Sequence, residues 1–223
     1  MPNWCNNSIN ISGSTETIKT LWDEANKEDS GLLNAMKPMP KELDGTTSPT
    51  PQEGQAGYKG PQPKIDGFDN WYDWRVSNWG TKWDIDPSEG LEFTDNGDGT
   101  AQISGWFESA WAPPIQAYDT FLDDMDGCSL TADYHEPGMD FAGFYDNGDD
   151  QYMEGLGEWC EAVVKGSCAL EDTPELFQKL EDQFELIENA REYIEEQMLE
   201  EDEEKARRDE KNGLYPQHED VAN

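Results

Sequence analysis

Alternating apolar and polar positions predict several strands in the first 150 residues. In residues 5–13, Cys5, Asn7, Ile9 and Ile11 fall on one face and polar residues on the other, which is the pattern of a half-buried strand. Further extended segments are expected at residues 82–86, 91–94, 101–108, 130–134 and 141–146. The Asn-Gly and Asp-Gly pairs within residues 95–99 predict a hairpin turn, because both tolerate positive φ.

Helical spacing alternates with these strands. Ile18, Leu21, Trp22 and Ala25 share one face of a helix expected from a cap at Ser14 or Thr15 to about residue 27. A second helix is expected after Pro113 and Pro114, and a short one at residues 71–79, capped by Asp69 or Asn70 and ended by Gly80. Residues 32–39 predict an irregular segment or a short strand, and residues 159–164 a short helix.

The order strand–helix–strand–strand–helix–strand predicts an α+β fold: a ferredoxin-like antiparallel sheet with two helices on one face. We assign residues 1–168 to this domain. Within it, residues 44–67 are rich in glycine and proline and show no periodicity, so they predict a long surface insertion. Such a loop inside a domain is unusual and is either functional or disordered.

An acidic, heptad-patterned helix is expected over residues 172–211, and a disordered tail over residues 212–223. Apolar residues recur at gaps of three and four, and only Arg191 interrupts them; they are Phe177, Leu180, Phe184, Ile187, Ile194 and Met198. The seam fits a helix docked on its own domain or on a foreign partner helix. Self-pairing would bring like charges together, so the oligomeric state stays open.

The charge balance restricts the possible partners. Fifty acidic residues face 15 basic ones among 223 residues, a formal net charge of −35. This charge repels nucleic acid and anionic membrane surfaces, so neither is expected to bind directly. It suits a partner protein with a basic surface, such as a nucleic-acid-binding protein. The alternative is a general surface trait, as in salt-adapted organisms and their viruses.

Cysteine usage and the N-terminus indicate a reduced, cytoplasmic protein. The four cysteines form no Cys-x-x-Cys pair, and the chain shows neither a signal-peptide pattern nor an apolar run long enough to span a membrane. We find no motif for catalysis, a cofactor or a metal. The aspartates near residues 95–100 and 146–150 lack the EF-hand order and are interpreted as turn residues. His135 is interpreted as a solvated turn residue.

Residues 71–83 hold four of the nine tryptophans, which makes this segment a core, a binding face or both. Trp74 and Trp111 are expected to reach the surface. Base stacking would need flanking cations, and only two are present, so core packing or a groove for a protein or small molecule is favoured. The interaction candidates are Trp74, Arg75, Trp79, Lys82, Trp83 and Trp111.

Four segments carry a family resemblance. They are the opening Met-Pro-Asn-Trp-Cys-Asn-Asn, Lys37-Pro-Met-Pro40, Asn78-Trp-Gly-Thr-Lys-Trp-Asp84 and Phe107-Glu-Ser-Ala-Trp-Ala-Pro-Pro114. Over residues 1–150 the chain resembles the YubB-type ferredoxin-like domain family of bacterial plasmids and phages. The resemblance implies a ferredoxin-like domain and an origin in a mobile element. It implies no activity, because the family is functionally uncharacterised, and it does not extend past residue 172.

Three hypotheses follow. The first is a non-enzymatic phage or plasmid accessory protein that binds a host protein through an acidic surface resembling nucleic acid. The second is an enzyme or small-molecule-binding module with its site near residues 71–83. The third is a virion or structural protein that assembles through its C-terminal helix. The absence of catalytic motifs favours a protein without enzymatic activity.

Overall fold

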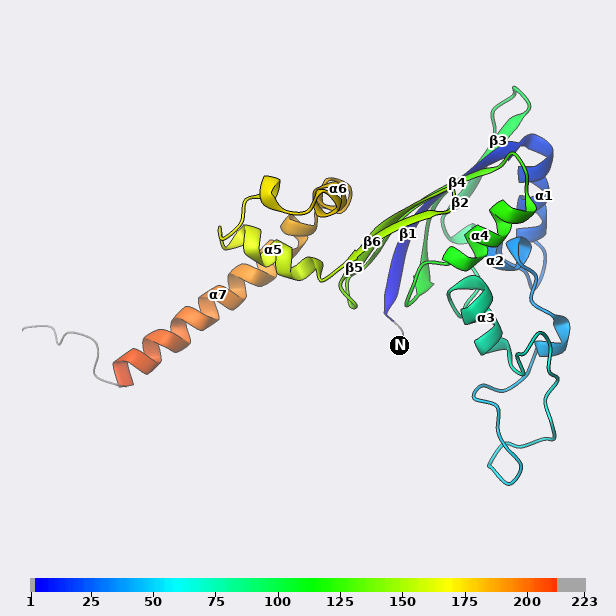
Figure 1. Cartoon of the computed structure of the whole chain (residues 1–223), viewed down its shortest axis with the longest axis horizontal. Coiled ribbons are helices and arrows are strands. Elements are labelled where there is room, and N and C mark those ends of the chain that lie inside the picture. The colour runs from blue at the N-terminus through cyan, green and yellow to red at the C-terminus, as the bar shows by residue number, and fades with distance from the viewer. Residues whose placement is uncertain (1–2, 212–223) are drawn as a thin grey trace, which may run out of the picture. The chain divides into compact units, whose positions relative to one another are not determined.

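The structure, a computed structural model, describes residues 3–211 and divides into two compact units after Glu154 (Figure 1). The first unit contains all six strands, and the second contains three α-helices of the described chain. The predicted domain boundary at residue 168 therefore differs from the observed division. The predicted tail at residues 212–223 lies outside the described residues.

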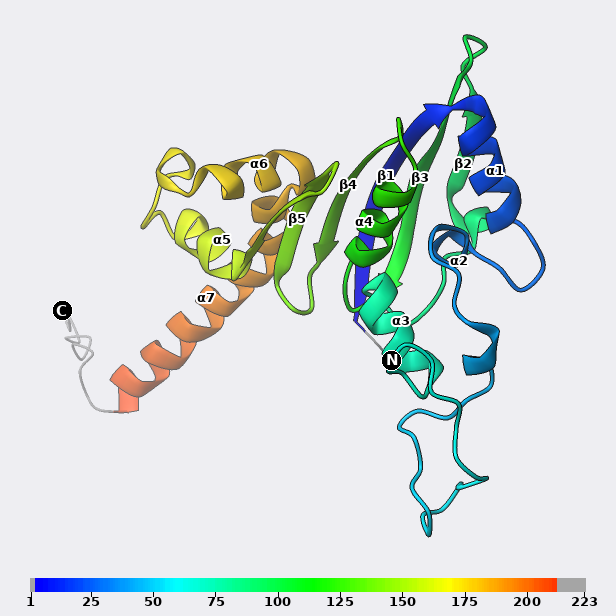
Figure 2. The same ribbon diagram turned by 45° about the vertical axis from the view of Figure 1, so that its right-hand side comes forward.

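One antiparallel sheet forms the frame of the first unit, so the fold is a mixed α+β arrangement. Its strands pair in the order β2-β3-β1-β4-β5-β6. Figure 2 shows them side by side, with helices α1 to α4 packed beside them. The strand bounds are Trp4–Ser14 (β1), Leu91–Asp95 (β2), Thr100–Ala110 (β3), Ser129–Glu136 (β4), Phe141–Asp146 (β5) and Asp149–Glu154 (β6).

The predicted alternation decides which face of the sheet is buried. In β1, the side chains of Cys5, Asn7, Ile9 and Ile11 are buried, while the intervening residues from Trp4 to Asn10 are exposed. The register with β3 pairs Asn7 with Phe107, which is also buried. Since successive residues of a strand point to opposite faces, the buried positions of adjacent strands fall on one face.

The helices of the first unit supply the other half of the core. Their bounds are Thr15–Ala25 (α1), Leu32–Met36 (α2), Trp71–Trp79 (α3) and Ile115–Asp124 (α4). Short 3-10 helices occur at Lys41–Leu43 (η1) and Pro87–Glu89 (η2). Apolar residues of all four α-helices join those of the strands in one buried cluster, which includes Ile18, Leu33, Trp79, Phe121 and Ile103.

Two helix starts follow from local capping. The Ser14 hydroxyl accepts a hydrogen bond from the Thr17 amide at the start of α1. The Asn70 side chain does the same for the Asp73 amide at the start of α3. Gly80 ends α3 in the left-handed conformation, with φ of 92°. Ser14 and Asn70 are each one of the two candidate caps that the sequence offers, and Gly80 is the predicted end of α3.

Three local predictions differ from the structure. Residues 32–39, expected as an irregular segment or strand, begin with the helix α2. Residues 82–86, expected as a strand, form none, because the Asp84 carboxylate turns back to accept hydrogen bonds from the amides of Leu33 and Asn34. Strand β6 was not predicted; it pairs with β5 through the hairpin at Asn147-Gly148.

The glycine- and proline-rich insertion at residues 44–67 contains no α-helix and no named strand. One of its residues, Thr50, contacts the segment just before α3. The Thr50 hydroxyl donates a hydrogen bond to the Asp69 carboxylate and accepts one from the side-chain amide of Asn70. The insertion is therefore tied to α3 by side-chain hydrogen bonds.

The second unit is helical. It contains α5 (Leu156–Val164), a 3-10 helix η3 (Leu170–Asp172), α6 (Glu175–Phe184) and α7 (Leu186–Lys211). The prediction of one continuous helix over 172–211 is wrong, because Glu185 takes a left-handed conformation with φ of 51° and separates α6 from α7. The apolar seam is divided accordingly: Phe177 and Leu180 are buried on α6, and Ile187 and Ile194 on α7.

Among the described residues, no helix combines the length and apolar character needed to cross a bilayer.

Candidate functional site

The tryptophans of α3 are mainly part of the core. Trp79 is 0% exposed and Trp74 is 3% exposed, so neither is available at the surface. Trp74 was expected to reach the surface, and this prediction is wrong: the helix places it edge-on against Trp79, with the ring centroids 5.8 Å apart. The Trp79 indole also donates a hydrogen bond to the Lys37 carbonyl at 2.8 Å.

The side chain of Arg75 interacts with aromatic rings and a carboxylate of the protein itself. Its guanidinium lies over the rings of Trp71 and Trp79, at 5.3 and 4.7 Å from their centroids. It also interacts electrostatically with Asp84, a carboxylate that accepts backbone hydrogen bonds. Burial raises the pKa of Asp84, while these hydrogen bonds and Arg75 act to lower it. Arg75 and Asp84 therefore join α3 to α2.

Lys82, Trp83 and Trp111 do come together at the surface. The Lys82 ammonium lies 4.1 Å from the ring centroid of each indole, between the two. Trp83 also contacts Trp4, and Trp111 contacts Tyr72. Trp4, Trp83 and Trp111 are 39–40% exposed. We call Trp4, Tyr72, Lys82, Trp83 and Trp111 the tryptophan–lysine surface; its role in binding stays a prediction.

The replacement Lys82→Met is expected to lower the free energy of unfolding by about 0.5–1 kcal/mol, the size of a cation–π interaction at an exposed site. Methionine keeps an apolar stem between the indoles and removes the charge. Urea unfolding would measure the change. Lys41→Met, at an exposed position in η1, is the matched control. Equal changes in the free energy of unfolding of the two variants would contradict a stabilising role for the contacts of Lys82 with Trp83 and Trp111.

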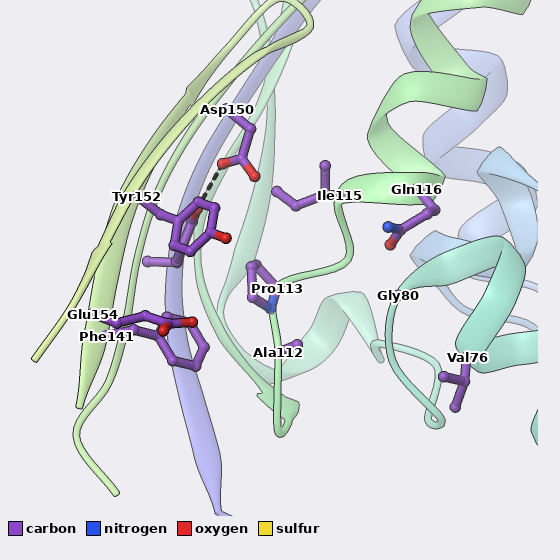
Figure 3. Close-up of a pocket in the computed structure, with 11 residues that line it drawn as sticks. Val76, Gly80, Ala112, Pro113, Ile115, Gln116, Phe141, Asp150, Tyr152 and Glu154 are labelled. Carbon is purple, nitrogen blue, oxygen red and sulfur yellow. Dashed lines mark hydrogen bonds between the residues drawn. The ribbon is translucent and has the colours of Figure 1, made fainter. Parts of the chain in front are cut away.

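A pocket of about 300 Å³ lies between the β4-β5-β6 end of the sheet and the loop that leads into α4 (Figure 3). Three of the residues lining its sheet side, Asp150, Tyr152 and Glu154, belong to β6, and the others are Tyr134 and Phe141. The opposite side comes from α3, α4 and the segments next to them, at Val76, Gly80, Ala112, Pro113, Ile115 and Gln116. We call this the acidic pocket.

Pairing between β5 and β6 positions the acidic residues. Asp150 is opposite Tyr145, Tyr152 opposite Gly143, and Glu154 opposite Phe141, so all three β6 residues point to the side occupied by the core. Gly143 leaves room for Tyr134, because a Cβ there would lie 2.4 Å from the Tyr134 hydroxyl. The Tyr134 ring packs edge-on against Phe141.

The carboxylates give the pocket a negative potential. The Tyr134 hydroxyl donates a hydrogen bond of 2.6 Å to Asp150. Burial, followed by this bond, raises the pKa of Tyr134, so the phenol stays protonated at neutral pH. Burial also raises the pKa of Asp150; the hydrogen bond from Tyr134 acts to lower it, and the nearby charges of Asp119 and Asp149 raise it further.

Lowering the pH from 7 is expected to stabilise the fold down to about pH 4, where unfolded carboxyls titrate. Burial raises the pKa of Asp84, Asp133 and Asp150, so the folded state binds protons at a higher pH than the unfolded chain. Falling net charge acts in the same direction. His135 lies in β4 and is not the solvated turn residue that the sequence predicts; burial lowers its pKa, which opposes the effect at one group.

Below about pH 4 the trend should reverse. Hydrogen bonds from Thr50, Ser88 and Thr100 lower the pKa of Asp69, Asp86 and Asp98 respectively, and this stabilisation is lost as those carboxylates protonate. Urea unfolding at several pH values and constant ionic strength would follow both phases. A steady loss of stability from pH 7 to 5 would contradict the prediction.

The aspartate-rich turns show ordinary turn geometry. The Asp95 carboxylate accepts from the Gly97 amide, and Asp98 accepts from the amide and hydroxyl of Thr100. Among the described residues, no group of three or more His, Cys, Asp and Glu side chains is arranged to hold a metal ion.

Comparisons with known proteins add little. No family model and no curated protein matches the chain. A solved structure of the protein api92 from Yersinia pseudotuberculosis, of the family DUF1281, is similar at 21% sequence identity with a TM-score of 0.29. The match covers 40% of this chain and 32% of the api92 chain. The present chain therefore spans about a third of the length of api92.

Proposed function

We propose that this protein is a non-enzymatic accessory protein that binds a partner protein with a basic surface. The observation that carries the proposal is the excess of carboxylates, 50 against 15 lysines and arginines. A charge of this size attracts basic surfaces at long range and accelerates their association.

The ion pairs of the described residues leave most of this charge available. All six join residues three or four positions apart within a helix or at its C-terminal end, and they use only six carboxylates: Asp23, Glu24, Glu161, Glu188, Glu195 and Glu203. Each is exposed, and exposed pairs of this kind stabilise a fold by about 0.5 kcal/mol or less. Exposed carboxylates of α7 that take part in none of these pairs, such as Glu196, Glu200 and Glu204, are therefore open to a partner's cations.

Helix α7 supports an acidic surface that resembles nucleic acid. It carries 11 acidic residues against five basic ones, and all of the acidic residues except Asp209 are exposed. Its 26 residues extend about 39 Å at 1.5 Å per residue. That length is close to one turn of B-DNA, about 34–36 Å. A protein that binds phosphates along a duplex would meet a comparable row of negative charge.

We further infer a ferredoxin-like arrangement with helices α1 and α4 on one face. The strand order β2-β3-β1-β4 and its antiparallel pairing support this inference, because a β-α-β-β-α-β unit produces that order. With the YubB-type resemblance of residues 1–150, it favours an accessory protein of a plasmid or phage.

Retention of proteins from a bacterial lysate tests the proposal. The immobilised chain should retain a basic nucleic-acid-binding protein at low salt, and duplex DNA or high salt should release it. Neutralising the exposed Glu196, Glu200 and Glu204 of α7 to glutamine should weaken retention. The matched control replaces Glu16, Glu28 and Glu42, exposed residues of the first unit. Failure to retain any basic protein at low salt would refute the proposal.

A further inference from the structure

The acidic pocket combines two kinds of group that recognise organic cations. Its sheet side presents the rings of Tyr152 and Phe141, and the carboxylates of Asp150 and Glu154 lie on either side of Tyr152 along β6 (Figure 3). Aromatic faces attract cations through their quadrupole, and carboxylates attract them through charge. The opposite side is mostly apolar and adds one amide, from Gln116.

The described chain supplies no cation to this pocket. No lysine or arginine lines it. Neither Asp150 nor Glu154 forms an ion pair with a described residue. The nearby carboxylates of Asp119 and Asp149 both add to the negative potential at Asp150. This contrasts with the tryptophan–lysine surface, where Lys82 already occupies the space between the indoles.

We propose that the acidic pocket binds the guanidinium group of an arginine side chain presented by the basic partner. This assignment rests on the proposed function for the identity of the partner, and on the pocket alone for the chemistry of the ligand. The acidic surface would attract the partner, and the pocket would fix where one of its arginines is held.

The shape of the pocket favours guanidinium over ammonium. A guanidinium is planar, so it stacks on a flat ring while its edge donates two hydrogen bonds to a carboxylate. Tyr152 offers such a ring, with 56% of its surface exposed, and Glu154 is an exposed carboxylate two residues along the same strand face. The volume of about 300 Å³ is at the lower end for ligand pockets, which suits a side chain better than a large cofactor.

Binding of N-acetyl-arginine amide to the full chain tests the assignment, with N-acetyl-citrulline amide as the neutral analogue of the same shape and N-acetyl-lysine amide as the alternative cation. NMR titration would measure the dissociation constants. We expect saturable binding of the arginine compound, with resonance shifts at Tyr152 and Gln116. Both comparison compounds should bind at least about tenfold more weakly.

Three variants locate the site. Glu154→Gln, Asp150→Asn and Tyr152→Ala change residues that line the pocket and should each weaken arginine binding about tenfold or more. Glu108→Gln is the matched control, since Glu108 is an exposed carboxylate on the sheet face away from the core, and it should leave binding unchanged. Equal binding of citrulline or lysine amide, no saturable arginine binding, or retained binding in Glu154→Gln would overturn the assignment.

Failure of this assignment and failure of the proposed function are distinguishable. If a basic partner is retained equally by the wild type, Glu154→Gln and Tyr152→Ala, the pocket assignment fails and the proposed function stands. If arginine amide binds with the expected variant pattern while no basic protein is retained, the proposed function fails and the guanidinium site stands.

Discussion

Replacing Asp84 with alanine is expected to lower the free energy of unfolding of the first unit by about 3 kcal/mol. The Asp84 carboxylate accepts hydrogen bonds from the amides of Leu33 at 2.8 Å and Ile85 at 2.9 Å, and it also bonds the Asn34 amide. Without it, two amides at the start of α2 lose their acceptor, and Arg75 loses the stronger of its charge interactions with Asp84 and Asp44. Partly buried donors left unpaired carry a full desolvation penalty.

Asp86→Ala is the matched control for this variant, because it removes the same charge two residues away. Asp86 is exposed, and within residues 3–211 its carboxylate accepts hydrogen bonds only from the amide and hydroxyl of Ser88. Its loss should change stability by about 1 kcal/mol or less. Urea unfolding of both variants would measure the difference, and equal effects would show that the contact between Asp84 and α2 contributes nothing beyond charge.

The variant Trp79→Ala is expected to destabilise the fold by about 3–5 kcal/mol, the range measured for removing a large aromatic side chain from a core. Trp79 is fully buried, packs against Trp74, and supports the guanidinium of Arg75. Alanine would leave a cavity and an unpaired Lys37 carbonyl. Chemical unfolding followed by circular dichroism would report the change without relying on tryptophan fluorescence.

Trp83→Ala is the control, since Trp83 is 40% exposed and stands only four residues further along the chain. It should destabilise much less than Trp79→Ala. If the two variants lose similar stability, the tryptophan–lysine surface is part of the core in solution. A small loss in Trp79→Ala would instead contradict the buried position of that indole.

Elements with a local signal could be predicted from the sequence. Apolar and polar residues alternate along strand β1. Helices α1 and α3 begin at their own capping residues, and α3 ends at a glycine with positive φ. The helix α2 has no such signal. Its first amides are satisfied by Asp84, about fifty residues away, so its five residues depend on a contact that only the folded chain provides.

The break between α6 and α7 also has no signal in the sequence. Glu185 adopts positive φ without a glycine or proline to mark it, and the apolar spacing continues across it. The Glu181 side chain accepts from the Ile187 amide and so supports the start of α7 from the preceding helix. Periodicity records which positions are apolar, and it remains intact when two helices meet at an angle.

The acidic pocket is absent from the sequence predictions because they omit β6, the strand that carries three of its residues. The sequence Asp-Asp-Gln-Tyr-Met-Glu of β6 is too polar to show alternation. One signal was present: Asn147-Gly148, with φ of 49° and 95°, is a two-residue hairpin turn of the kind that demands a returning strand. A strand that begins directly after this turn has Asp150, Tyr152 and Glu154 on one face, because alternate residues of a strand point to the same side.

Strand β6 is the last strand of the sheet, and such strands carry backbone amides and carbonyls that can pair with another chain. Asp149, Asp150 and Glu154 give it a negative charge, so two copies brought edge to edge would repel each other. The carboxylates assigned to arginine therefore also limit self-association. Neutralising all three at once should promote aggregation, which light scattering would detect, so the binding variants should be made one at a time.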